Sequence, residues 1–201
     1  MKKNLYAFII SFIFLCLFSS PAIAADVMSE LKESIQAVID TIKNKQKATT
    51  PEAQAVQRKK IFSIAQSFFN FKEMSKRTLG KEWKQIPKEK QDRFAHLFAR
   101  FLANIYYKRL EEYTNETVKY LEQRQHKNKL MIKTLVVTQK NEIPMNYKLL
   151  KSDRWRVYDI SIEGVSLVRN YRSQFHKILR KKGIEELMNM MSQKLGQFSD
   201  L

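Results

Sequence analysis

Side chains that could carry out chemistry are few in this sequence, and they are scattered. The three histidines, His96, His126 and His176, have no neighbouring ligand at the spacing of a metal site. No nucleophile elbow, phosphate-binding loop or dinucleotide fingerprint occurs in the chain. Asp159 and Glu163 lie at the end of one predicted strand and could form a carboxylate pair for acid–base catalysis. The same carboxylates could instead pair with nearby arginines or cap the following helix, which is the interpretation that we favour.

Hydrophobic periodicity predicts the elements that would position these residues. Thr50 and Asn70 are suitable helix N-caps, whereas Gly80 and Gly183 are suitable helix ends. The segment from 88 to 113 carries the widest apolar face and would be about 39 Å long at 1.5 Å per residue. Apolar residues recur at helical spacing in six segments: 27–45, 51–69, 71–79, 88–113, 165–182 and 184–197.

The period changes to two in the middle of the chain, which predicts four strands at 117–125, 129–139, 143–151 and 155–162. The breaks between them are so short that neighbouring strands must form antiparallel hairpins. Helices followed by a meander predict an α+β architecture, with a curved antiparallel sheet of about four strands covered on one face by helices. A long aromatic helix over such a sheet could enclose a cavity for acyl chains, although the same residues would also fill an ordinary core.

The N-terminus has the pattern of a cleavable secretory signal peptide. Lys2 and Lys3 precede an apolar run over residues 5–18, and small residues stand at Ala22 and Ala24. The run of about 14 residues is shorter than the roughly 20 that a helix needs to cross a bilayer. We therefore predict a signal peptide over 1–24, with cleavage after Ala24.

Two alternatives to cleavage after Ala24 are an uncleaved membrane anchor and a lipid-modified Cys16. Leu15 argues against the second alternative, because a lipoprotein signal needs a small residue before the cysteine. The mature chain, 25–201, would be a single domain without cysteine, so it can form neither a disulfide nor a thiolate metal site.

The charge of the chain is strongly positive. The 37 Lys and Arg residues outnumber the 20 Asp and Glu residues, which gives a net charge of +17. Loss of Lys2 and Lys3 with the signal peptide leaves +15. Such a charge favours nucleic acid, anionic phospholipid or an acidic protein surface as a partner. Export argues against nucleic acid, and a solvated basic surface that aids solubility would explain the charge equally well.

Three segments resemble the MlaC family of ABC-transporter auxiliary proteins, also known as toluene-tolerance proteins. The first is W-R-V-Y-D-I-S-I-E-G-V-S-L-V-R-N-Y-R-S-Q-F at 155–175, and the second is L-R-K-K-G-I-E-E-L at 179–187. The third, F-N-F-K-E-M-S-K-R-T-L-G at 69–80 with Trp83, is similar to an F-D-F-x-x-M-x-x-x-x-L-G-x-x-W segment. Asn70 stands where the family commonly has Asp.

The resemblance implies a function that spacing and composition do not show. It implies an NTF2-like α+β fold in the periplasm and a phospholipid held with its acyl chains inside the protein. Its implied partners are phospholipid, an inner-membrane Mla-type ABC transporter complex and an outer-membrane lipoprotein–porin complex, in a system that maintains outer-membrane lipid asymmetry. It implies no enzyme activity, cofactor, metal or nucleic acid, and we expect a monomer. Close relatives handle hopanoids, so a different lipid class stays open.

For a lipid carrier of this kind, we predict three sets of lining residues, from the long helix, the sheet and the helix after the sheet. Each of them could equally be plain core. A non-carrier periplasmic adaptor of a transporter, and an enzyme that uses Asp159 or Glu163, are the rival functions. The predicted lining residues are Phe98, Phe101, Leu102, Ile105, Met145, Tyr147, Leu149, Tyr158, Ile160, Ile162, Val165, Val168 and Tyr171.

Overall fold

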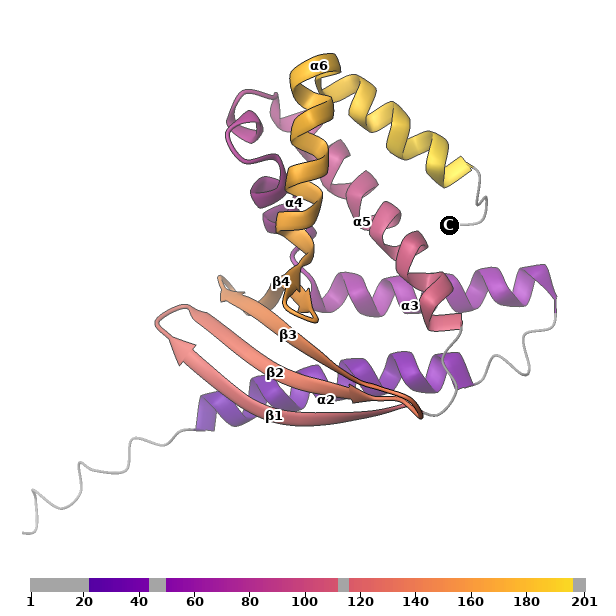
Figure 1. The fold of residues 1–201 in the computed structure, drawn as a ribbon, viewed down its shortest axis with the longest axis vertical. Coiled ribbons are helices and arrows are strands. Elements are labelled where there is room, and N and C mark those ends of the chain that lie inside the picture. The colour runs from indigo at the N-terminus through magenta and orange to yellow at the C-terminus, as the bar shows by residue number, and fades with distance from the viewer. Residues whose placement is uncertain (1–21, 44–49, 112–115, 197–201) are drawn as a thin grey trace, which may run out of the picture.

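The structure, a computed structural model, describes residues 22–43, 50–111 and 116–196 (Figure 1). Almost all of the proposed signal peptide lies outside these ranges, so its cleavage and the domain boundary at 25 stay predictions. No helix within the described ranges is both long enough and apolar enough to cross a membrane. The helices are α2 (Ala22–Lys43), α3 (Pro51–Phe68), α4 (Phe71–Leu79), α5 (Lys88–Glu111) and α6 (Leu167–Gly196), with a 3-10 turn η2 (Glu82–Lys84).

Local signals set the helix boundaries as predicted. The backbone N–H of Ala53 donates to Thr50 Oγ1 at 3.3 Å, which caps α3. The N–H of Glu73 donates to Asn70 Oδ1 at 2.9 Å, which caps α4. Gly80 then ends α4 with a φ of 64°. These caps satisfy N–H groups that have no partner inside the helix.

The sheet is antiparallel throughout, in the order β1-β2-β3-β4-β5, which confirms the α+β class and the meander. The four predicted strands are β1 (Thr117–His126), β2 (Lys129–Val137), β3 (Glu142–Lys151) and β4 (Trp155–Ile162). A fifth strand, β5 (Val165–Ser166), lies where we predicted the start of a helix. Its two residues are too few to show a period, and positive φ angles at Glu163 (50°) and Gly164 (80°) create the turn before it.

A β-bulge in β4 changes the direction of one aromatic side chain. Lys148 pairs with Asp159 and Leu149 with Val157, so Tyr158 has no partner on β3. An extra residue in one strand disturbs the alternation of faces. Tyr158 consequently packs with the helices, whereas Ile160, opposite Tyr147, packs on the other face with β2 and β3.

The helices form two layers that treat the sheet differently (Figure 1). Helix α2 runs along the sheet, and Val27 and Leu31 are buried against strand residues. Helix α5 packs mainly against α4 and α6, and α6 reaches β4 and β5. The expectation that the long aromatic helix lies over the sheet is therefore wrong, because periodicity shows that a helix has an apolar face but not what covers it.

Two large groups of buried side chains form the core. The helical cluster joins α4, η2, α5 and both halves of α6: Met74, Leu79, Trp83, Phe94, Phe98, Phe101, Leu102, Leu167, Val168, Tyr171, Phe175, Leu187, Met188 and Met191. The sheet cluster joins α2, the end of α3 and strands β2–β4: Val27, Leu31, Phe68, Leu130, Ile132, Tyr147, Leu149, Trp155 and Val157.

Candidate functional site

The predicted lining residues do not form one wall, because the structure divides them between the two clusters. Those in or against the helical cluster are Phe98, Phe101, Leu102, Ile105, Tyr158, Val168 and Tyr171. Those in or against the sheet cluster are Met145, Tyr147, Leu149 and Ile160. Ile162 is half-buried, and Val165 is 60% exposed on the short strand β5.

Most of the predicted residues on α5 and α6 fill their space with one another. The Phe98 and Tyr171 rings meet edge to face with centroids 5.6 Å apart, and Phe98 and Phe175 do so at 5.7 Å. Phe101 contacts Tyr171 in the same way, at 5.7 Å. Such edge-to-face pairs are the favourable packing of a core. The core interpretation left open by the sequence therefore suits Phe98 and Phe101.

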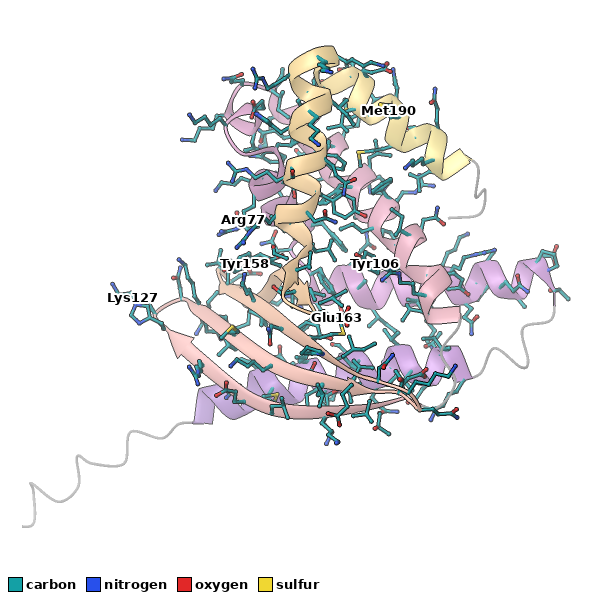
Figure 2. The ribbon with its side chains drawn as sticks, viewed as in Figure 1. Arg77, Tyr106, Lys127, Tyr158, Glu163 and Met190 are labelled. Atoms are coloured by element: carbon teal, nitrogen blue, oxygen red, sulfur yellow. The ribbon has the colours of Figure 1, made fainter. Side chains whose placement is uncertain are left out.

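The edge of the helical cluster has a different character, and we call Phe101, Ile105, Tyr106, Arg109 and Tyr171 the aromatic rim. Ile105 and Tyr106 are only half-buried, and Arg109 is exposed with its guanidinium 5.6 Å from the Tyr106 ring centroid (Figure 2). Burial raises the pKa of Tyr106, and burial together with the Tyr106 phenol raises the pKa of Tyr171 to about 12. Both phenols are thus neutral donors at neutral pH, beside a cation and an apolar wall.

A second set of half-buried side chains borders the sheet cluster, and we call Ile35, Tyr120, Met145 and Ile160 the sheet rim. They come from α2, β1, β3 and β4 and pack against fully buried neighbours such as Leu149. Burial raises the pKa of Tyr120 to about 12. Apolar groups that are only half covered retain surface that a further apolar molecule can bury.

Phe69 connects the two clusters. Its ring packs against both of them, 6.3 Å from Phe68 and stacked at 5.6 Å on Phe71. The N–H of Asn70 donates to the Val157 carbonyl oxygen at 2.8 Å, which ties this segment to β4. The apolar interior is therefore continuous from the helices to the sheet through Phe69.

Asp159 acts as a cap and an ion-pair partner. Its carboxylate is buried, accepts from Ser166 Oγ at 2.8 Å and from the Val168 N–H at 3.1 Å, and pairs with Lys148 Nζ at 3.1 Å. Ser166 Oγ also accepts from the Arg169 N–H at 3.1 Å. The capping role favoured by the sequence is thus present, with a lysine from β3 in place of an arginine.

Glu163 takes no part in that group. Its side chain is exposed, and its backbone N–H donates to the Pro144 carbonyl oxygen at 2.9 Å at the end of β4 (Figure 2). Asp159 and Glu163 therefore do not form the carboxylate pair that acid–base catalysis would require. No group of His, Cys, Asp and Glu suited to a metal occurs among the described residues.

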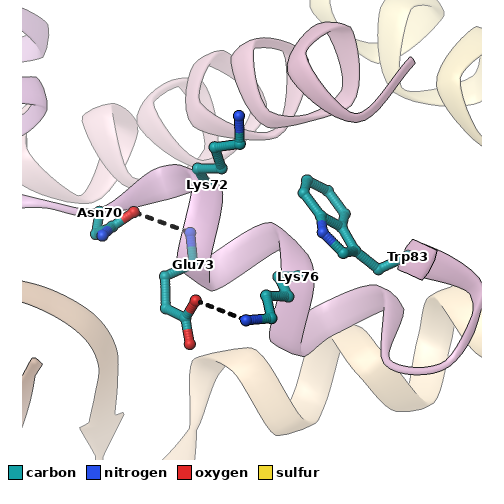
Figure 3. Close-up of a pocket in the computed structure, with 5 residues that line it drawn as sticks. All are labelled: Asn70, Lys72, Glu73, Lys76 and Trp83. Carbon is teal, nitrogen blue, oxygen red and sulfur yellow. Dashed lines mark hydrogen bonds and ion pairs between the residues drawn. The ribbon is translucent and has the colours of Figure 1, made fainter. Parts of the chain in front are cut away.

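A surface pocket of about 330 Å³ beside α4 is lined by charged groups (Figure 3). Lys76 Nζ pairs with Glu73 Oε2 at 3.6 Å, and Lys72 pairs with Asp92. Asn70 is the cap of α4, and Trp83 is mostly buried in the helical cluster. These groups have structural partners, and the wall is unsuited to an acyl chain, which requires apolar contact.

Sequence reasoning missed two members of the aromatic rim, Tyr106 and Arg109, as lining residues. Tyr106 belongs to the apolar pattern of the long helix, so its position could have been found from periodicity. Arg109 has no such signal, because nothing in its local sequence shows that it lies beside two tyrosines. Phe69 stood in a family segment, but its position between two clusters depends on the tertiary fold.

These features define an α+β protein with an apolar interior bordered by half-buried aromatic and aliphatic side chains. The chain belongs to the MlaC protein family, which matches residues 32–193 and confirms the resemblance seen in the motifs.

Two relatives extend the comparison. The intermembrane phospholipid transport system binding protein MlaC of Haemophilus influenzae is 24% identical over 137 residues, or 65% of this chain, and the match spans 64% of that protein. The phospholipid-binding protein from Ralstonia solanacearum, solved in complex with a phospholipid, has a TM-score of 0.71 and 24% sequence identity. That likeness covers 84% of this chain and 96% of the other, and it shows the shared fold.

Proposed function

We propose that this protein is a periplasmic phospholipid carrier that exchanges lipid between the outer membrane and an inner-membrane ABC transporter. The observation that carries the proposal is the match of residues 32–193 to the MlaC family. A relative named for intermembrane phospholipid transport and a structural neighbour solved with a phospholipid support it. The transporter and an outer-membrane lipoprotein–porin complex are the proposed partners, and catalysis is not required for this role.

The apolar rims supply what such a carrier needs. Each methylene is worth about 0.8 kcal/mol on leaving water, so two chains of roughly 15 methylenes would cost about 24 kcal/mol to expose. In this proposal, the acyl chains lie along the aromatic rim and the sheet rim, where half-buried apolar side chains border the interior. Phe69, which packs against both clusters, would move or turn to admit them.

Arg109 is the proposed partner of the lipid phosphate. It lies at the solvent edge of the aromatic rim, and its positive charge suits a phosphate oxygen. The neutral phenols of Tyr106 and Tyr171 can donate hydrogen bonds to the same headgroup. This arrangement places a headgroup toward water and its chains toward the interior.

Native mass spectrometry of the mature protein, expressed in a Gram-negative periplasm and purified without detergent, tests lipid binding. We expect a mass increase of one phospholipid, identified by extraction. A protein of bare mass that also takes up no lipid from vesicles would overturn the proposal and favour an adaptor role. Extraction of a hopanoid would keep the carrier and change the lipid class.

A pair of substitutions tests the site. Ile105→Arg puts a charge on the aromatic rim and should abolish lipid retention, because a charge is costly beside an acyl chain. Ile86→Arg is the matched control, since Ile86 is also half-buried against the helical cluster but stands 19 residues earlier, about 28 Å away along a helix. Equal lipid retention by the two variants, with both folded by circular dichroism, would refute this location.

A further inference from the structure

Two hairpins of the sheet gather basic residues at one end of the molecule. The turn between β1 and β2 carries Lys127 at its outermost point (Figure 2), and the turn between β3 and β4 carries Lys151 and Arg154. The two turns touch, because the Lys151 N–H donates to the Asn128 carbonyl oxygen at 3.0 Å. We call this surface the cationic tip; it consists of Arg124, Lys127, Lys129, Lys148, Lys151, Arg154 and Arg156.

The acidic residues near the cationic tip do not balance this charge. Asp159 is buried and already bound to Ser166, the α6 backbone and Lys148. Asp153 accepts from Ser152 Oγ at 2.6 Å, and Glu122 pairs with Arg124 at 3.1 Å. The surface from 124 to 129 contains no acid at all, and all six of its residues are exposed. A strong positive field therefore projects from this end of the sheet.

The composition of the cationic tip favours a lipid surface over a protein partner. Protein interfaces are enriched in aromatic and apolar anchors and depleted of lysine. The large apolar side chains that are most exposed among the described residues, Val56, Leu121, Val165 and Met190, lie outside the cationic tip. Lysine and arginine on extended turns instead suit the diffuse negative charge of anionic headgroups, with which each interacts by about 1 kcal/mol.

A recess beside the two hairpins could receive one headgroup. It has a volume of about 210 Å³, and its basic lining residues are Arg124, His126, Lys129 and Lys148. Tyr158, displaced to this face by the β-bulge, closes one side, and the Arg77 guanidinium lies 4.1 Å from the centre of its ring (Figure 2). The recess lies outside both apolar rims, so it is distinct from the proposed position of the acyl chains.

We propose that the cationic tip docks this protein onto the surface of an anionic phospholipid bilayer, with the two hairpin turns lying among the headgroups. This function goes beyond lipid carriage, since a carrier could equally meet its donor and acceptor only through proteins. Docking through the tip leaves the aromatic rim on α5 and the sheet rim free of direct membrane contact.

Co-sedimentation of the mature protein with lipid vesicles tests the proposal. We expect binding to phosphatidylcholine vesicles that contain 30% phosphatidylglycerol, no binding to pure phosphatidylcholine, and loss of binding in high salt. The triple variant Lys127→Glu, Lys151→Glu, Arg154→Glu should lower the partition coefficient at least about 100-fold. The matched control Lys59→Glu, Lys60→Glu, Lys181→Glu changes the net charge equally at exposed positions on α3 and α6 and should bind nearly as well as wild type.

Additional variants separate the possible outcomes. Lys127→Arg, Lys151→Arg, Arg154→Lys keeps the charge and should bind like wild type. Equal losses in the two triple Glu variants would show a general effect of net charge and overturn the docking site. Absence of binding to anionic vesicles by wild type would overturn it in favour of an acidic protein partner. The Glu variant at the tip should keep its bound lipid by native mass spectrometry, and loss of that lipid would assign these residues to the cargo site instead.

Discussion

Tyr158 and Asp159 are adjacent in sequence, yet one serves a surface and the other a helix. The bulge leaves Tyr158 without a partner on β3 and places it under Arg77, while Asp159 pairs with Lys148 and caps α6. Alternation in the sequence grouped Tyr158 with Ile160 on one face. A bulge depends on how a strand meets its neighbour, so that grouping could not be corrected before the sheet was known.

Removal of the Asp159 carboxylate should weaken the fold without touching the apolar rims. Asp159→Ala leaves Ser166, the Val168 N–H and Lys148 without their acceptor, and we expect the free energy of unfolding to fall by about 2–4 kcal/mol. Urea denaturation measures this change. Glu163→Gln, at an exposed position, should stay within about 0.5 kcal/mol of wild type. Full stability of the Asp159 variant with loss of a turnover would instead support the enzyme hypothesis.

At the scale of elements, α6 bends sharply in the middle, and the bend brings both halves onto the same cluster. Gly183 has φ 79° and ψ 179°, a conformation in which side chains are strained. Tyr171 and Phe175 pack before the bend, and Leu187 and Met191 pack after it. The sequence predicted two helices separated by this glycine, and the bend between them confirms it.

Gly183→Ala should destabilise the protein through backbone strain alone. A Cβ atom at this position meets nothing within 4 Å, so no collision contributes. We expect a loss of about 1–3 kcal/mol in the free energy of unfolding by urea denaturation. Gly196→Ala is the control, because Gly196 has no positive φ and equally open surroundings; it should change stability by less than about 0.5 kcal/mol. An equally small effect at Gly183 would show that α6 tolerates another bend.

Across the whole molecule, lipid should act as part of the core. Removal of bound lipid should lower the melting temperature by about 5–10 °C, since a ligand at 100 times its Kd stabilises a protein by about 2.7 kcal/mol and each kcal/mol shifts a domain of this size by about 2–4 °C. Differential scanning calorimetry before delipidation, after it and after addition of phospholipid measures the effect. Ile105→Arg should melt at the same temperature in all three states. A wild-type melting temperature that ignores lipid would argue against burial of acyl chains.

The sequence by itself determined the elements and the family. Caps at Thr50 and Asn70, the glycines at 80 and 183, and the short breaks between strands are local signals, because the chemistry that starts or stops an element lies within a few residues. The MlaC motifs at 69–83 and 155–187 are likewise visible in one dimension.

Only the tertiary structure decided which layer each helix joins. It placed α2 on the sheet, α5 among helices, Arg109 beside Tyr106, and the two basic hairpin turns side by side. The physical reason is that burial of apolar surface has no direction of its own: a greasy helical face gains equally from a sheet or from another helix. The choice between them is made by the packing of the whole chain.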